Sequence, residues 1–346
     1  MSAGRKIAVL GAGAIGSSVG ADLVKAGHDV ALIDQWPAHV EAMKSQGLRI
    51  VMTDEELHVP VQAYHLCEVA TLNRPFDIVL IAAKGYDTRW MAELIKPYLK
   101  PDGFAVGMQN GMNDDTIVSV VGYGRTLGCV LELSAEVFTP GVVQRNTTHQ
   151  STWLGFGELH GRVTPRLREL GAMMESVARV SLTTNIWGAK WTKLVNSSMI
   201  LSVFGMLGMQ SWEATDIPEV FKLSIRVGRE TMAVGAALGY TMEPIFGFTA
   251  EELMGSTDEI VEKLLRAVLG HLGPSARRTR GVVLQDYAKG RYTEVDYLSG
   301  VVVKKGQEAG IPTPANAAVM HINQQIRAGV LKPERANLAR VEAMLR

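Results

Sequence analysis

The chain has 346 residues, of which 47% are hydrophobic and 20% charged, and its 35 basic residues balance its 35 acidic ones. This length suits two domains or one large domain with a sizeable core, and zero net charge argues against electrostatic binding of nucleic acid or of an acidic membrane. The two cysteines, Cys67 and Cys129, are too few for a disulfide framework and lie in apolar stretches. We therefore expect a reduced, cytoplasmic protein with neither a signal peptide nor a membrane span.

The chain opens with an apolar strand, a glycine-rich turn and a helix. These segments occupy residues 6–10, 11–16 (Gly11-Ala12-Gly13-Ala14-Ile15-Gly16) and 17–26. Gly11 permits the tight turn, Gly13 lets the backbone approach a pyrophosphate, and Gly16 lets the helix pack closely on the strand. This order predicts a dinucleotide site, with the pyrophosphate on the N–H groups at the start of the helix.

The second predicted strand, at 28–33, ends at Asp34, close to the roughly 20-residue spacing at which an acidic residue binds the adenosine ribose of NAD. A carboxylate there repels the 2′-phosphate of NADP, and Gln35 rather than arginine follows it. We therefore favour NAD(H), with NADP(H) left open because Lys84 or Arg89 could reach a phosphate from a later loop and helix. A solvated turn aspartate is the alternative interpretation of Asp34.

Strands and helices alternate through the first half of the chain. The pattern predicts a hairpin at 48–52 and 57–61, strands at 76–81 and 104–108, helices at 87–98, 113–121 and 163–177, and a strand-rich stretch at 126–154 with a turn at 139–141. This alternation is typical of an α/β fold, here a Rossmann-like doubly wound parallel sheet with extra strands at one edge.

Beyond about residue 183 the pattern becomes helical. We expect helices at 186–207, 217–238, 257–269, 293–309 and 315–327, with loops at 243–256 and 271–280. In the helix at 293–309, Thr293 is the expected N-cap and Gly310 the residue that ends it. The sequence therefore predicts a dinucleotide-binding domain at 1–183 and an all-helical substrate and dimerisation domain at 184–346, whose methionine-rich, apolar character favours a homodimer.

Two polar residues follow predicted strands of the first domain, at the edge where open α/β sheets bind ligands. Asn110 carries both a donor and an acceptor, so it can orient a hydroxyl or a carboxamide near the nicotinamide. Lys84 follows the strand at 76–81. A plain Asn-Gly turn and a solvated lysine are the alternative interpretations of these two residues.

Reduction of a ketone also needs a proton donor near the carbonyl oxygen. Lys193, Asn196 and Ser197 stand at i, i+3 and i+4, so they share one helix face. A lysine arrives protonated, with an ordinary pKa of ~10.4, and can donate. Glu294 lies in the first turn of the predicted helix at 293–309, where a carboxylate is favoured. A surface lysine and ordinary helix capping are the alternative interpretations. No histidine or cysteine spacing is typical of a metal site.

These residues make the chain similar to the ketopantoate reductase (2-dehydropantoate 2-reductase) family. The matching segments are the glycine-rich turn, Lys84, Gln109-Asn110-Gly111-Met112, Trp191-Thr192-Lys193-Leu194 and Thr293-Glu294-Val295-Asp296-Tyr297, with support at 284–286 and 310–316. The resemblance implies a Rossmann domain and a helical domain with the active site between them, and reduction of a 2-oxo acid to a 2-hydroxy acid, usually with NADPH.

The resemblance also implies roles for individual residues. Lys193 is the expected general acid, and Glu294 holds the substrate or orients the lysine. Asn110 contacts substrate or cofactor, and Lys84 contacts the cofactor. Asn196 and Ser197 are the expected further substrate contacts, from their place on the face of Lys193.

Three departures from the family pattern bear on specificity. Asp34-Gln35 replaces an expected arginine, which favours NADH. Ser197 and Leu201 replace asparagines, and Val282 replaces a serine that binds the substrate carboxylate. Lost polar partners can change selectivity by ~10⁴, so the substrate could instead be a bulkier or less polar keto acid. The same fold would also suit a 3-hydroxy acid dehydrogenase or a non-catalytic dinucleotide sensor.

Overall fold

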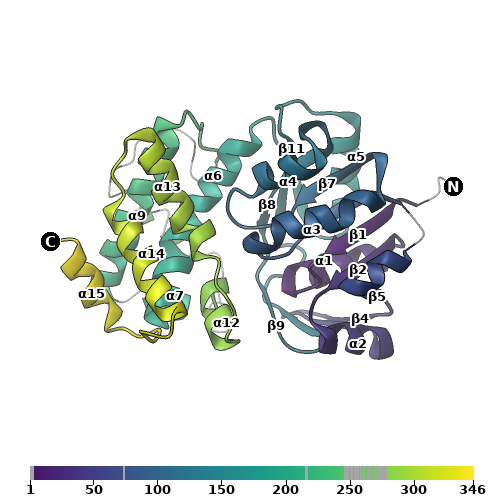
Figure 1. The fold of residues 1–346 in the computed structure, drawn as a ribbon, viewed down its shortest axis with the longest axis horizontal. Helices are drawn as coiled ribbons and strands as arrows, with labels where there is room; N and C mark the ends of the chain where they lie inside the picture. Colours follow the sequence, from purple (N-terminus) through teal and green to yellow (C-terminus); the bar gives the residue numbers. More distant parts are fainter. Residues whose placement is uncertain are drawn as a thin grey trace. The chain divides into compact units, whose positions relative to one another are not determined.

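The computed structural model describes residues 4–72, 75–214, 217–244 and 279–346, with isolated positions between 249 and 270. They form two compact units, Met1–Gln109 with Asn113–Ile186 and Asn110–Met112 with Trp187–Arg346 (Figure 1). The helix expected at 257–269 and the loops expected at 243–256 and 271–280 lie largely outside the described residues.

The first unit is built on an eight-stranded sheet. Its strands are β1 (Lys6–Leu10), β2 (Asp29–Asp34), β5 (Gln62–His65), β6 (Phe76–Ile81), β7 (Leu99–Gly107), β8 (Thr126–Glu132), β11 (Trp153–Glu158) and β12 (Arg179–Leu182). The order is β12-β11-β8-β7-β6-β1-β2-β5, and every neighbouring pair is parallel except β11 with β8. The chain thus winds outward in both directions from β1, and ligands bind at such a switch point.

Helices cover both faces of this sheet. They are α1 (Ala14–Lys25), α2 (Pro37–Gln46), α3 (Thr88–Ile95), α4 (Asp114–Val121) and α5 (Pro165–Met174), with 3₁₀ turns at Leu66–Thr71, Gly85–Asp87, Lys96–Tyr98 and Tyr123–Arg125. In β1, Ile7 and Val9 belong to the core that contains α1 and α5. Ala8 and Leu10 belong to the opposite core, which contains α3 and α4. This double burial explains why β1 is an unbroken apolar run.

A second sheet corrects one expectation. β3 (Leu48–Val51), β4 (Glu56–Val59), β9 (Ala135–Thr139) and β10 (Val142–Arg145) pair in the order β4-β3-β10-β9. The extra strands at 126–154 therefore do not all extend the main sheet. β9 and β10 leave it because their alternating apolar side chains, among them Val137 and Val143, pack into the core around α1. As a result α1 is enclosed between the main sheet and the second sheet.

The second unit is helical throughout its described residues. It contains α6 (Ile186–Ser197), a π-helical segment (Ser198–Ser202), α7 (Val203–Leu207), α8 (Ser211–Ala214), α9 (Pro218–Ala237), α12 (Val282–Ala288), α13 (Ser299–Ala309), α14 (Pro314–Arg327) and α15 (Asn337–Met344). One core, with Trp191 and Val227 among its fully buried members, contains residues of α6, the π-helical segment, α7, α9 and α12–α15. Within the described part of the chain, no helix has the length and apolar character needed to cross a membrane.

Two local expectations are wrong. The helix predicted to start at Thr293 begins only at Ser299, because Val295–Tyr297 form a 3₁₀ turn and Leu298 takes a non-helical backbone (φ −111°, ψ −97°). Cys67 is exposed rather than set in apolar surroundings, because its 3₁₀ turn (Leu66–Thr71) presents it to solvent, whereas Cys129 is buried as expected. Gly310 ends α13 in a left-handed conformation (φ 70°), as predicted.

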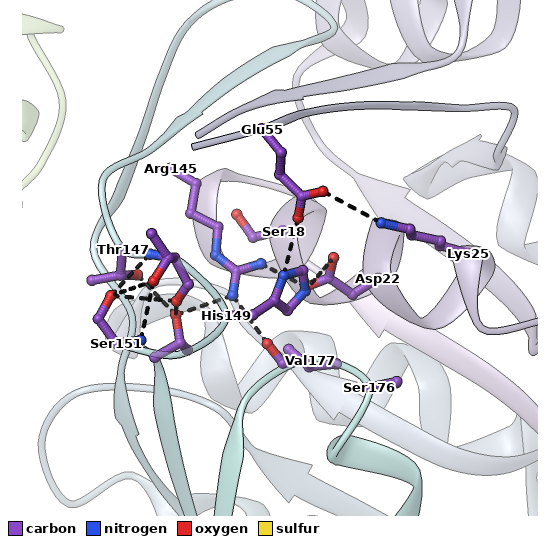
Figure 2. A network of polar contacts seen from close by, with 12 residues as sticks. Ser18, Asp22, Lys25, Glu55, Arg145, Thr147, His149, Ser151, Ser176 and Val177 are labelled. Carbon is purple, nitrogen blue, oxygen red and sulfur yellow. Dashed lines mark hydrogen bonds and ion pairs between the residues drawn. The ribbon is translucent and has the colours of Figure 1, made fainter. Parts of the chain in front are cut away.

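Enclosing α1 buries a charge that needs a partner. Asp22 lies on α1, and its Oδ2 accepts a hydrogen bond from Nη1 of the fully buried Arg145 at 2.5 Å (Figure 2). The Arg145 guanidinium also donates to Thr152 Oγ1 and to the Val177 carbonyl, both at 3.0 Å. Burial raises the pKa of the Asp22 carboxyl, and Arg145 opposes that rise. The ion pair therefore joins α1 to β10 and to the segments before β11 and β12.

Removing Arg145 alone should lower the free energy of unfolding much more than removing Arg145 and Asp22 together. Arg145→Met leaves the buried Asp22 carboxylate with only the part-exposed His149 beside it, whose Nε2 lies 3.2 Å from Asp22 Oδ1, so we expect the free energy of unfolding at pH 7 to fall by up to about 3–5 kcal/mol. The loss should shrink as pH falls, because Arg145 opposes the rise of the Asp22 pKa; without it that pKa rises further, so the folded variant gains more stability from protonation of Asp22 than the wild type does. Urea unfolding at pH 5 and pH 7 measures both effects.

The double variant Asp22→Leu/Arg145→Met is the control. It removes both charges at once, so it should be more stable at pH 7 than Arg145→Met alone. Equal stability of the single and double variants would contradict this account of the ion pair.

Candidate active site

The glycine-rich turn has the geometry of a ligand cradle. Gly11 has a positive φ of 85°, and a Cβ there would lie 2.7 Å from the backbone of Ala83. A Cβ at Gly16 would lie 2.1 Å from the carbonyl oxygen of Gly11. At Gly13, by contrast, a Cβ would meet nothing within 4 Å. Close packing therefore requires the first and third glycines, while the second faces open space at the start of α1, where N–H groups favour an anion.

Asp34 lies beside this turn. The backbone N–H groups of Gly11 and Ala12 donate to the carbonyl of Ile33, at 2.9 and 3.4 Å, which ties the turn to the end of β2. Asp34 follows directly, is only 7% exposed, and accepts a hydrogen bond from the backbone N–H of Trp36 at 2.8 Å. Its burial does not fit a solvated turn aspartate. Its position fits a residue that contacts the adenosine ribose.

The ends of β6 and β7 are joined by Gln109, a residue for which the sequence motifs predicted no role of its own. Gln109 is buried, and its Nε2 donates to the carbonyl of Ala83 at 2.7 Å and to Thr88 Oγ1 at 2.8 Å. These bonds fix the loop that carries the half-buried Lys84. The neighbouring Asn110 is also half-buried, and Gly111 has the positive φ (80°) expected of the Asn-Gly turn.

The most informative polar group of the second unit is Asn196, on α6. It is 3% exposed, and neither its Oδ1 nor its Nδ2 has a hydrogen-bond partner among the described residues. The Oγ of the adjacent Ser197 is buried and equally unpartnered. Lys193, one turn earlier, is half-buried. An unmade buried hydrogen bond costs about 1–3 kcal/mol, so this cluster fits a surface that a polar ligand completes.

The backbone around this cluster is unusual as well. The π-helical segment Ser198–Ser202 follows Ser197 directly, and π-helical turns inside α-helices are frequent at functional sites. Sequence periodicity does not show such a turn here, because residues 199–207 are apolar at most positions, so a shift of one residue in the helical register leaves no visible break in the pattern.

Glu294 is buried, with 5% exposure, and precedes the 3₁₀ turn at Val295–Tyr297. Neither Glu294 nor Thr293 caps α13, whose N-cap is Leu298. The interpretation that Thr293 and Glu294 only cap this helix is therefore wrong. The buried Glu294 carboxylate lies in the segment that resembles the ketopantoate reductase family. Among the described residues, no group of three or more His, Cys, Asp or Glu side chains could hold a metal ion.

The unpartnered amide allows a direct test. Asn196→Leu replaces an unsatisfied polar group with an apolar one of similar size, so we expect the ligand-free protein to gain about 1–3 kcal/mol in free energy of unfolding. Asn323 is the matched control. It is a buried amide of the same unit whose Nδ2 donates to the carbonyls of Ser202 and Val319.

Asn323→Leu should therefore lose stability where Asn196→Leu gains it. Denaturant unfolding of the two variants and the wild type measures these differences in the free energy of unfolding. A loss of similar size in both variants would show that Asn196 is a structural amide.

Family models and curated relatives match most of the length of this chain. The family models described as ketopantoate reductase PanE/ApbA and its C-terminal part match residues 7–158 and 185–327. The 2-dehydropantoate 2-reductase of Archaeoglobus fulgidus is 25% identical over 94% of this chain and 99% of its own length. That of Mesorhizobium japonicum is 27% identical over 93% and 97%.

Solved structures show the same fold. A PanE/ApbA family ketopantoate reductase from Ralstonia eutropha is 27% identical, with a TM-score of 0.78 over 94% of this chain and 99% of its own. A D-mandelate dehydrogenase solved with NADH and anilino(oxo)acetate is 20% identical, with a TM-score of 0.80, and supports the fold alone. Since the two family models together span most of its length, this chain belongs to the PanE/ApbA ketopantoate reductase family.

Proposed function

We propose that this protein is a pyridine-nucleotide-dependent reductase that converts a 2-oxo acid to the corresponding 2-hydroxy acid. The observation that carries the proposal is the face of α6, where Lys193 stands one turn before the buried, unpartnered Asn196 and Ser197. Such a face supplies a proton and polar contacts to a small oxygen-rich substrate. The open cradle at Gly13 suits the pyrophosphate of the cofactor.

The roles divide between the two parts of the chain. Residues 1–183 bind the dinucleotide through the glycine-rich turn, Asp34 and Lys84, and residues 184–346 supply the substrate contacts. When bound, the reduced nicotinamide supplies a hydride to the carbonyl carbon. The Lys193 ammonium then protonates the carbonyl oxygen, which becomes the hydroxyl of the product.

Further residues orient the substrate. Asn196 and Ser197 bind its oxygen atoms, and Asn110 contacts substrate or cofactor with its amide. Glu294 holds the substrate or orients the Lys193 ammonium. These roles follow from the family pattern and the shared face of α6, and the burial of Asn196, Ser197 and Glu294 supports them.

The substrate is proposed to be ketopantoate or a 2-oxo acid with a less polar substituent. Ser197, Leu201 and Val282 stand where the family pattern has polar groups. A Cβ at Gly281 would lie 3.2 Å from Leu201 Cδ2, so Leu201 packs against the residue that precedes Val282. This apolar neighbourhood supports the less polar class. An activity assay with 2-oxo and 3-oxo acids distinguishes the proposed reductase from a 3-hydroxy acid dehydrogenase. A protein that binds the nucleotide but reduces none of these acids would be a dinucleotide sensor.

The setting of the protein is part of the proposal. The apolar, methionine-rich helical part favours a homodimer, and the two free cysteines suit a reduced, cytoplasmic environment. The partners are small molecules, and the balanced charge does not favour nucleic acid.

Lys193→Ala should remove the proton donor while leaving the dinucleotide cradle intact. We expect kcat to fall by about 10²–10⁴, the usual contribution of general acid catalysis, with the Kd of the nucleotide unchanged. Nucleotide oxidation with ketopantoate and a fluorescence titration measure the two quantities. Lys222→Ala, which removes an exposed lysine of the same unit, is the control, and unchanged turnover in Lys193→Ala would refute the assignment.

We propose NADH as the preferred cofactor, with NADPH as the alternative. Asp34→Ser/Gln35→Arg removes the repelling carboxylate and adds a guanidinium that can bind the 2′-phosphate. A charge-assisted hydrogen bond contributes about 1.5–3 kcal/mol, so the ratio of kcat/KM for NADPH over NADH should rise about 10- to 100-fold. Gln46→Arg adds the same charge at an exposed end of α2 and should leave the ratio unchanged. A wild type that prefers NADPH would overturn the proposed preference.

A further inference from the structure

A histidine that the proposed mechanism does not use is buried against the dinucleotide cradle. His39 lies in α2 and has no exposed surface. Its Nε2 is 2.8 Å from the carbonyl oxygen of Ala12, in the glycine-rich turn, and 3.2 Å from Ser17 Oγ. Its Nδ1 accepts a hydrogen bond from the backbone N–H of Gly141 at 2.9 Å. One imidazole thus connects the cradle to the turn between β9 and β10.

These contacts determine which nitrogen of the neutral imidazole carries the proton. The N–H of Gly141 can only donate, so Nδ1 presents its lone pair and carries no proton. The proton of the neutral ring then sits on Nε2, which donates to the Ala12 carbonyl. The ring of Trp36 stacks on the imidazole, with centroids 5.4 Å apart and planes 20° apart, and so limits its rotation.

Holding the Ala12 carbonyl also sets the direction of the next N–H. The Ala12 oxygen receives two donors, His39 Nε2 and Ser17 Oγ, the latter at 2.6 Å. In a planar trans peptide the N–H points opposite to the C=O, and the described chain has no cis peptide. The N–H of Gly13 therefore points away from these donors. Gly13 is the N-cap of α1, where a Cβ would meet open space.

We propose that His39 is a positioning residue of the dinucleotide site. It fixes the Ala12–Gly13 peptide so that the Gly13 N–H faces the cofactor pyrophosphate before the cofactor arrives. This saves the cost of ordering the turn on binding. The inference rests on the proposed dinucleotide-dependent function and adds a residue outside the glycine motif to it.

Two amide variants separate the two contacts of the ring. An asparagine oxygen occupies about the place of Nδ1, so His39→Asn keeps an acceptor for Gly141 and loses the donor to Ala12. A glutamine amide reaches the place of Nε2, so His39→Gln keeps the donor to Ala12 and loses the acceptor for Gly141. Both variants lose the ring and its stack on Trp36, so their losses of thermal stability should be similar.

The experiment measures the Kd of NADH by fluorescence titration of the purified full-length wild type and both variants, with Tm measured in parallel. Loss of one hydrogen bond is expected to raise the Kd of His39→Asn about fivefold, with Ser17 still holding the carbonyl. His39→Gln should stay within about twofold of the wild type. At saturating NADH, kcat and the KM for the keto acid should be unchanged in both, because the reacting groups are untouched.

The outcomes separate this role from a purely structural one and from failure of the proposed function. Wild-type affinity in His39→Asn overturns the inference, and so do equal losses of affinity in both variants, which would follow from stability alone. A wild type that binds neither NADH nor NADPH overturns the proposed function together with this role. Nucleotide binding without turnover removes the reductase function, while the affinities of the two variants still decide the role of His39.

Discussion

The first unit depends on the close approach of the glycine-rich turn to the start of α1. At Gly16 no side chain fits, because its Cβ would overlap the carbonyl oxygen of Gly11. That contact lets α1 begin within the turn that follows β1, with its N-cap, Gly13, at a position where a Cβ would meet nothing within 4 Å. The cradle is therefore a consequence of packing as well as of backbone freedom.

The same packing makes α1 a buried helix, and the rest of the unit responds to that burial. A helix covered by two sheets cannot send the polar side chains of its buried turns, Ser17, Ser18 and Asp22, to water. Asp22 is paired with Arg145 from β10, and Ser17 bonds to the Ala12 carbonyl beside His39 from α2. Arg145 lies far from α1 in the sequence, and His39 lies outside the glycine-rich turn. The hydrogen bonds that satisfy the polar groups of α1 and its N-terminal turn thus also connect the second sheet and α2 to the glycine-rich turn.

The second unit shows the opposite arrangement at α6. Another buried amide of this unit, Asn323, is fully engaged with the backbone of the π-helical segment and α14. Asn196 and Ser197 are left without partners among the described residues. A protein that places unsatisfied groups beside a half-buried lysine gives up stability at that position. Such a loss is expected where a ligand, rather than the fold, completes the hydrogen bonds.

Local chemistry was enough to predict much of this molecule. Glycine spacing, strand-to-helix order and hydrophobic periodicity predicted the parallel sheet, the cradle at residues 11–16, the position of Asp34, and the helices at 186–207, 217–238 and 315–327, because each depends on neighbours in sequence. The tertiary structure alone decided that β9 and β10 form a second sheet, that α13 starts at Ser299, and that Cys67 is exposed. It also decided that Arg145 and His39 serve α1, and that Asn196 is buried without a partner among the described residues. The second sheet, the roles of Arg145 and His39, and the burial of Asn196 depend on contacts between distant segments. Periodicity along the chain carries no information about which distant group satisfies a buried charge, carbonyl or amide.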